Sequence, residues 1–133
     1  MSTINTNFIV SPRWILPVIP RNSLLENHSL VVVGSKIADL LPTADIQEKY
    51  PDLPNLALPE QLLMPGLINT HGHAAMVLLR GYADDFELKT WLAEHIWPVE
   101  NRLADFDFVY DGTTLAIAEM ICSGTTTVAD SYF

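Results

Sequence analysis

The segment Met64-Pro65-Gly66-Leu67-Ile68-Asn69-Thr70-His71-Gly72-His73 carries most of the structural information in this chain. Pro65-Gly66 interrupts the preceding pattern, and Leu67–Thr70 then predicts a buried β-strand that ends in His71-Gly72-His73. Side chains two residues apart in a strand point to the same face, so we expect the two imidazoles to lie within reach of one metal ion. Zn²⁺ and Fe²⁺ both accept imidazole nitrogen. The alternative is a pair of histidines in a polar loop.

The residues after this motif predict helices followed by a second strand. Phe86–Trp97 predicts a helix that Pro98 ends, and Val99–Leu103 is compatible with a second segment after it. A longer helix, capped by Asp105 or Asp107, precedes a strand at Thr125–Asp130. The order strand, helices, strand is typical of a parallel sheet, whose strand ends in α/β barrels carry the chemistry.

The residues before the motif predict a different kind of structure. Four short β-rich runs alternate with prolines and turn residues, which indicates an antiparallel unit; the runs are Phe8–Val10, Trp14–Leu16, Leu30–Val33 and Ile37–Leu41. Thr43–Tyr50 predicts one or two helical turns, and Asp52–Pro59 predicts a proline-rich connection. We therefore expect two regions, residues 1–63 and residues 64–133.

Composition excludes several classes of protein. The 133 residues are 49% hydrophobic and 17% charged, which is typical of a globular chain rather than a disordered one. The net charge of −9 argues against a nucleic-acid partner, and no apolar run approaches the ~20 residues of a membrane span. The N-terminus lacks the pattern of a secretory signal, and a single cysteine excludes an internal disulfide, so a cytoplasmic location is expected.

Two carboxylates are further candidates for the site. Asp130 ends the second predicted strand, where it would face the same cavity as the histidines or, equally, cap the following loop. Glu100 follows Trp97-Pro98-Val99, and spacing alone favours a solvated surface position for it. A parallel sheet of two strands is not a stable domain, so we expect the chain to be the front part of a longer protein. The alternative is a truncated, non-catalytic binding or assembly module that needs a partner to cover its sheet edge.

The motif resembles the first-strand metal motif of the amidohydrolase superfamily. Further stretches resemble the 5-methylthioadenosine/S-adenosylhomocysteine deaminases and the related triazine hydrolases; they are Leu79–Asp85, Trp91-Leu92 with Ile96–Glu100, and Glu119–Ile121 with Gly124–Asp130. The resemblance covers most of the chain and is strongest from residue 64 to residue 133.

This resemblance implies an α/β fold. The family has a metal-dependent (β/α)8 TIM barrel and a small β-sandwich, of which this chain would hold the first two βα units and the N-terminal part. His71 and His73 would be ligands of one divalent metal ion, with Zn²⁺ expected first and Fe²⁺ as the alternative. Glu100 would hold the ribose hydroxyls, and Trp91, Trp97 and the loop around Tyr82 would wall the pocket. The remaining ligands and the acid/base glutamate would lie outside this chain, so no catalytic residue is assigned and the 133 residues alone should be inactive.

The implied activity is hydrolytic deamination of an adenine nucleoside. 5-Methylthioadenosine or S-adenosylhomocysteine would be converted to the inosyl product and ammonia, with a small-molecule nucleoside as the partner and a homo-oligomer as a compatible assembly. The alternative within enzymes is an amidohydrolase that acts on another ring, such as guanine, cytosine or s-triazine.

Overall fold

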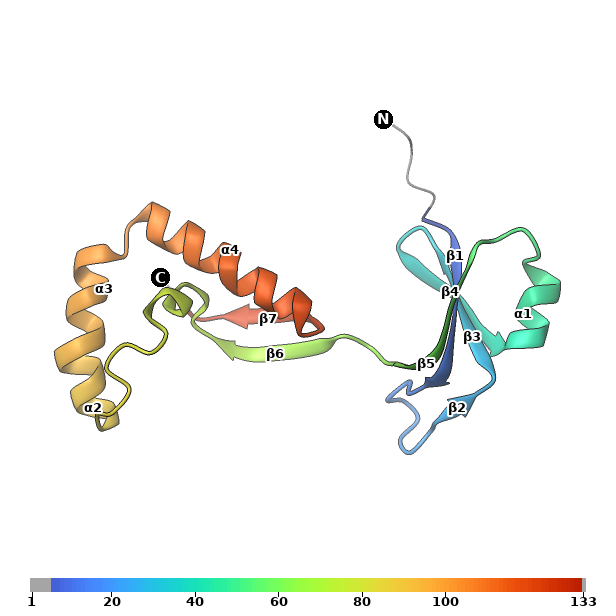
Figure 1. The fold of residues 1–133 in the computed structure, drawn as a ribbon, viewed down its shortest axis with the longest axis horizontal. Coiled ribbons are helices and arrows are strands. Elements are labelled where there is room, and N and C mark those ends of the chain that lie inside the picture. The colour runs from blue at the N-terminus through green and yellow to red at the C-terminus, as the bar shows by residue number, and fades with distance from the viewer. Residues whose placement is uncertain (1–5, 133) are drawn as a thin grey trace. The chain divides into compact units, whose positions relative to one another are not determined.

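The computed structural model describes residues 6–132 and contains two compact units, Met1–Pro65 and Gly66–Phe133. Both are drawn in Figure 1. The first unit is a five-stranded sheet with one helix, and the second is a two-stranded sheet with several helical segments. The chain is therefore a mixed α/β protein. None of the helices in residues 6–132 combines the length and the apolar character that crossing a membrane requires.

The first unit is built around β1 (Phe8–Ile15), which pairs with three other strands. The sheet order is β2-β1-β3-β4, with β5 also on β1; the remaining elements are β2 (Leu25–Glu26), β3 (His28–Val33), β4 (Lys36–Pro42), α1 (Thr43–Lys49) and β5 (Asn55–Leu63). The pairs β1–β3 and β3–β4 are antiparallel, as predicted, but β1–β5 is parallel.

Two predictions about prolines in this unit were wrong. The runs around Pro12 form one strand, and most of the predicted connection Asp52–Pro59 belongs to β5. The β1–β5 register shifts between Pro12 and Trp14, and Pro59 follows Leu58, the partner of Pro12. A proline cannot donate to the ladder, but a bulge removes the need for that donor, so both strands continue through their prolines.

The core of the first unit lies between the sheet and α1. Ile9, Val31 and Ile46 are buried there, and Leu41, Tyr50 and Leu53 pack against them. Burying a side chain of this size stabilises a fold by about 1.5–3 kcal/mol. α1 therefore covers one face of the sheet through a single inward-facing isoleucine.

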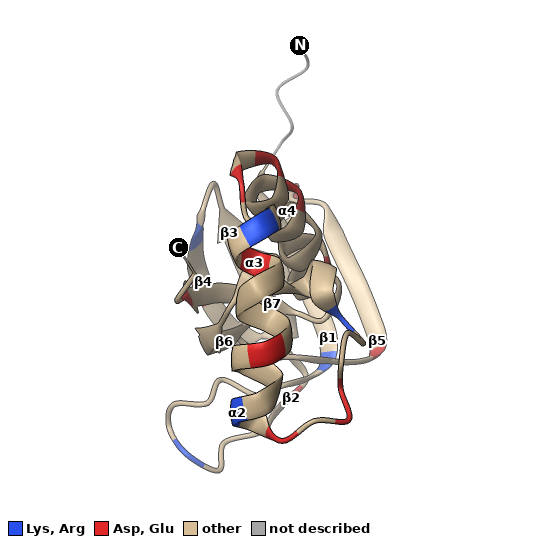
Figure 2. Ribbon diagram, turned by 90° about the vertical axis from the view of Figure 1, so that its left-hand side faces the viewer, with Lys and Arg blue, Asp and Glu red and all other residues tan. Residues whose placement is uncertain are grey.

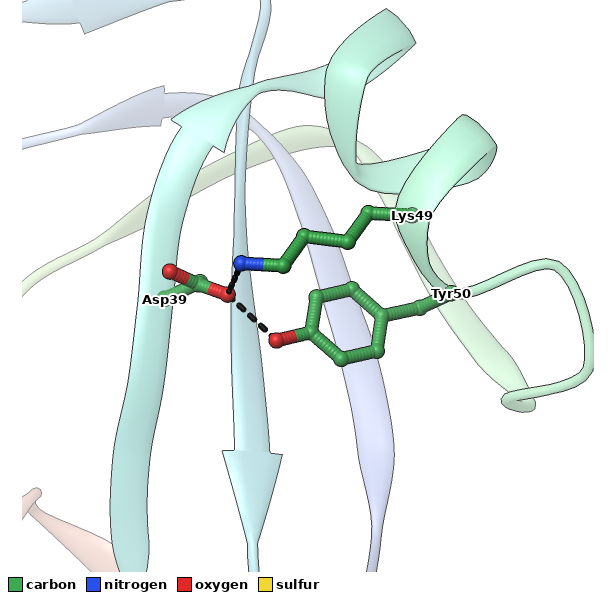
Figure 3. A network of polar contacts seen from close by, with 3 residues as sticks. All are labelled: Asp39, Lys49 and Tyr50. Atoms are coloured by element: carbon green, nitrogen blue, oxygen red, sulfur yellow. Dashed lines mark hydrogen bonds and ion pairs between the residues drawn. The ribbon is translucent and has the colours of Figure 1, made fainter.

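A polar cluster joins α1 to β4 at the edge of this core (Figure 3). Asp39 Oδ2 accepts hydrogen bonds from the Tyr50 hydroxyl and from Lys49 Nζ, the latter at 2.9 Å. The Tyr50 hydroxyl, and after it the Lys49 ammonium, hold the pKa of Asp39 below its ordinary value of 3.8. The same contacts raise the pKa values of Lys49 and Tyr50.

Replacing Asp39 by asparagine should remove an acid-sensitive part of the stability. The pKa of Asp39 is lower in the folded state, so its contribution is present above the unfolded value and is lost as the pH falls through the folded value. We expect Asp39→Asn to lower the urea midpoint at pH 7, with the difference from wild type closing below pH 3.8. Asp52→Asn, on an exposed turn, is the control; a difference that stays constant with pH would contradict the prediction.

The second unit contains the residues from Gly66 to His73 of the histidine motif. Its strands are β6 (Leu67–Gly72) and β7 (Thr125–Asp130), and its helical segments are the 3₁₀ helix η1 (Ala74–Leu79), α2 (Leu88–Thr90), the π-helix η2 (Trp91–Ile96), α3 (Trp97–Leu103) and α4 (Phe106–Cys122). β6 and β7 pair in parallel, which confirms the predicted sheet. α4 runs along these strands in Figure 1 and packs against η1 and β7.

The helix that follows the loop is longer than predicted. Pro98 does not end it, because α2, η2 and α3 run on from one another through Leu103. Pro98 lies in the first turn of α3, directly after the π-helix. The Trp97 amide donates to the Leu92 carbonyl in the i→i−5 pattern of a π turn, and this change of hydrogen-bonding pattern directly precedes the proline, which has no amide donor. Asp105 is the cap of α4, since its Oδ1 accepts from the Phe108 amide at 2.9 Å.

Glycines allow two close approaches in this unit. A Cβ on Gly112 of α4 would lie 2.7 Å from the Ala75 carbonyl oxygen, so glycine brings the helix onto η1. A Cβ on Gly66 would lie 2.1 Å from Thr126 Oγ1, so the Pro65-Gly66 break also lets β6 start close against β7. Other apolar side chains of this unit are exposed to solvent: Ile68 and Ile121 are 68% and 69% exposed.

Candidate metal and nucleoside site

His71 and His73 lie side by side at the end of β6. Their ring centroids are 5.2 Å apart, with the ring planes at 85°. Two imidazoles that share a tetrahedral Zn²⁺ at ~2.0–2.1 Å from each nitrogen have centroids about 5 Å apart. The spacing and the donor type therefore fit a shared divalent ion.

The surroundings of His73 fix the tautomer that a metal ligand needs. Its Nδ1 lies 3.1 Å from the carbonyl oxygen of Ser131, which can only accept, so Nδ1 carries the proton and donates. Nε2 then keeps its lone pair. Ligand histidines commonly donate their other nitrogen to a backbone carbonyl in this way.

Asp130 does not join the histidines as a third donor. Its Oδ1 accepts a hydrogen bond from the Ala74 amide at 2.8 Å, which ties the end of β7 to the first residue of η1. Within residues 6–132, no three His, Cys, Asp or Glu side chains gather closely enough to hold an ion together. A catalytic zinc site has three protein ligands or more, so the two histidines alone do not complete one.

A cleft of about 330 Å³ opens beside His73. Its walls come from the residue after β6, from η1, from the helix that begins at α2, and from the two residues after β7; they are His73, Met76, Leu88, Trp91, Leu92, Ile96, Trp97, Glu100, Ser131 and Tyr132. This is a mostly apolar surface with a few polar groups, which is typical of small-molecule sites. His71 is not among the lining residues that the structure describes.

Glu100 is the unusual member of this lining. It lies on α3 and is only 6% exposed, although carboxylates are rarely buried without a partner. Its Oε1 accepts a hydrogen bond from the Tyr132 hydroxyl at 2.9 Å. Burial, the hydrogen bond to Glu100 and the charges of Glu100 and Asp130 all raise the pKa of Tyr132. The phenol therefore remains a neutral donor at physiological pH.

The aromatic wall is held by the loop that precedes α2. Trp91 and Trp97 line the cleft, and the Trp91 Nε1–H donates to the Tyr82 carbonyl oxygen at 3.2 Å. Tyr82 itself is not in the described lining. Arg80 anchors the start of the loop through two hydrogen bonds to Glu119 of α4, at 2.9 and 2.6 Å.

The loop that leads into α2 carries negative charge. The loop before α2 contains Asp84, Asp85 and Glu87, and it is marked in red in Figure 2. Asp84 lies next to Trp91 in a hollow beside the cleft. A field of this sign favours neutral or cationic ligands over anionic ones.

Sequence reasoning missed two contributors to this site. Ser131 acts through its backbone carbonyl, for which a sequence carries no side-chain signal. Tyr132 was not singled out, although a polar aromatic residue directly after a strand of a parallel sheet was a usable indication.

Comparison with known proteins places this geometry in a family. A sequence model of the amidohydrolase family matches residues 62–133. A relative from Teredinibacter turnerae, named 5-methylthioadenosine/S-adenosylhomocysteine deaminase, is 51% identical over 99% of this chain and 30% of its own length. This confirms the resemblance inferred from the motifs.

Solved structures agree with the sequence match. An adenosine deaminase from Xanthomonas campestris with bound zinc is 44% identical, has a TM-score of 0.92, and is matched over 96% of this chain and 29% of its own. An atrazine chlorohydrolase from Arthrobacter aurescens complexed with zinc has a TM-score of 0.79 at 19% identity, over 94% of this chain and 28% of its own, and shares the fold. The chain thus spans about 30% of the length of the curated relatives it matches. Because the family match covers more than half of its residues, the chain belongs to the amidohydrolase family.

Proposed function

We propose that this chain contributes part of the active site of a metal-dependent enzyme that deaminates adenine nucleosides by hydrolysis. The observation that carries the proposal is the meeting of His73 and Glu100 in one cleft. His73 would then lie near one end of a bound ligand, at the metal, and Glu100 near its other end. The 51% identical relative, which is named a 5-methylthioadenosine/S-adenosylhomocysteine deaminase, supports this choice of substrate class.

In this proposal His71 and His73 are ligands of one divalent ion, with Zn²⁺ first because the 44% identical deaminase was solved with bound zinc. When bound, such an ion lowers the pKa of a coordinated water toward 7, so hydroxide becomes available near neutral pH. His73 keeps its proton on Nδ1, held by the Ser131 carbonyl, and so presents Nε2 in a fixed direction. The acid/base group would come from outside residues 1–133.

Glu100 would bind the sugar of the nucleoside. A buried carboxylate accepts hydrogen bonds from two neighbouring hydroxyls, which is the pattern of a ribose diol. Trp91 and Trp97 would pack against the ligand and keep water from it. The negative charge of Asp84, in a hollow beside the cleft, supports a nucleoside without phosphate, because it would repel a phosphate.

We further propose that β6 and β7 are the first two strands of a (β/α)8 barrel, and that residues 1–63 are part of a small β-sandwich. The open apolar faces of the second unit support this, since Ile68, Ile121 and Val128 are exposed at 68%, 69% and 41%. Side chains of this kind require a partner surface in a stable fold. The remaining strands would lie in the part of the relatives that this chain does not cover.

The test uses a full-length chimera, in which this chain replaces the residues that it matches in the Teredinibacter turnerae relative. We expect the chimera to convert 5-methylthioadenosine to its inosyl product, followed by the ultraviolet change from adenine to hypoxanthine. A chelator should abolish the conversion, and added Zn²⁺ should restore it. The unaltered relative is the control.

Two results would count against the proposal. A folded, metal-loaded chimera that leaves 5-methylthioadenosine and S-adenosylhomocysteine intact, but acts on guanine, cytosine or an s-triazine, would move the substrate to another ring. A folded chimera that binds no metal and converts nothing would favour the non-catalytic module.

A further inference from the structure

The three residues Asp130, Ser131 and Tyr132 each make a contact with a different part of the site. Asp130 Oδ1 accepts from the Ala74 amide at 2.8 Å, and the Ser131 carbonyl accepts from His73 Nδ1 at 3.1 Å. Tyr132 donates its hydroxyl to Glu100 Oε1 at 2.9 Å. In addition, the Ser131 amide donates to the Gly72 carbonyl at 2.9 Å. One short segment thus touches both the histidine end and the carboxylate end of the cleft.

We propose that Tyr132 is a positioning residue that fixes the carboxylate of Glu100 and thereby sets the preference of the site for a ribose diol. The inference rests on the proposed function. Tyr132 acts through Glu100, and the backbone of the same segment holds His73. The segment Asp130–Tyr132 would then position both the sugar end and the metal end of the ligand.

The geometry explains why a carboxylate on α3 needs this partner. Glutamate has three rotatable side-chain bonds, and a buried carboxylate without a donor is costly. The hydroxyl of Tyr132 supplies a donor to Oε1 and selects one orientation, which leaves Oε2 to accept from the ligand. Because its surroundings raise the pKa of Tyr132, the hydroxyl keeps its proton across the physiological range.

The experiment compares Tyr132→Phe with the unaltered chimera on two substrates, 5-methylthioadenosine and its 2′,3′-dideoxy analogue. We expect the variant to raise KM for the ribonucleoside about 10-fold, because the carboxylate of Glu100 is no longer held in one orientation, with little change in kcat. KM for the dideoxy analogue should stay the same, so the preference for ribose shrinks by the same factor. A general disturbance of the fold would raise KM for both substrates alike.

Matched variants separate the contact from the loss of a hydroxyl. Tyr110→Phe on α4 makes the same chemical change at an exposed residue outside the described cleft lining, and should leave both KM values unchanged. Glu100→Asp keeps the charge but withdraws the oxygen from Tyr132, and should also reduce the ribose preference. Adding Tyr132→Phe to Glu100→Asp should then have no further effect.

The outcomes distinguish this inference from the function on which it rests. If the unaltered chimera deaminates no nucleoside, the proposed function fails and the role of Tyr132 falls with it. If the chimera deaminates both substrates and Tyr132→Phe keeps the full ribose preference, only the inference is overturned. If the two changes are additive, Tyr132 does not act through Glu100 and the inference is likewise overturned.

Discussion

Replacing His71 by alanine is expected to lower kcat/KM of the full-length chimera on the order of 10³-fold, and His73→Ala should do the same. The two rings, with centroids 5.2 Å apart, are spaced to share one ion. Removing either leaves too few donors for a catalytic site, so the ion is lost or loosely held. The measurement is deamination of 5-methylthioadenosine, with the metal content of the same sample determined by elemental analysis.

His28→Ala is the matched control for this loss. His28 lies in β3 of the first unit, where its Nδ1 contacts the Glu26 carbonyl oxygen at 2.7 Å, and we expect activity and metal content to remain as in wild type. Full activity in His71→Ala would refute its assignment as a ligand. Full metal content with lost activity would instead indicate that His71 contacts the substrate.

The strand that leads into the paired histidines was predictable because its signals are local. Alternation places His71 and His73 on one face, and a helical connection is typical of parallel strands such as β6 and β7, so both followed from short stretches of sequence. The same holds for Asp105, whose capping role depends on an amide three residues away.

The errors came from contacts between distant residues. β5 looks like a connection because of Pro54 and Pro59, and only its pairing with β1, more than 40 residues away, makes it a strand. Pro98 looks like a helix end, since nothing in the local sequence announces the π turn before it. Tertiary pairing outweighs the local signal in the case of β5.

The carboxylate of the site was the least predictable feature from spacing. Glu100 follows a proline in a mixed sequence, a pattern that fits a surface residue, and the resemblance alone suggested a role. Its hydrogen-bond partner, Tyr132, is 32 residues away and follows β7. A partner at that distance is visible only once the fold is known.

Glu100→Gln should have the second largest effect on activity. We expect KM for 5-methylthioadenosine to rise about 10- to 100-fold, because an amide replaces a charged acceptor and hydrogen bonds to charged groups contribute about 1.5–3 kcal/mol. The 2′,3′-dideoxy analogue, which lacks both hydroxyls, should lose little. Steady-state kinetics on the two substrates measure the difference.

Thermal stability gives this prediction its sharpest form. Glu100 is 6% exposed, and a glutamine of equal size removes the cost of burying a charge, so Tm should stay the same or rise. Glu94→Gln, on the exposed side of η2, should change neither Tm nor KM. A fall in Tm with an unchanged preference for ribose would show that Glu100 serves the fold. If the buried carboxylate serves its ligand, Glu100→Gln should weaken the binding of ribose and leave the protein equally stable.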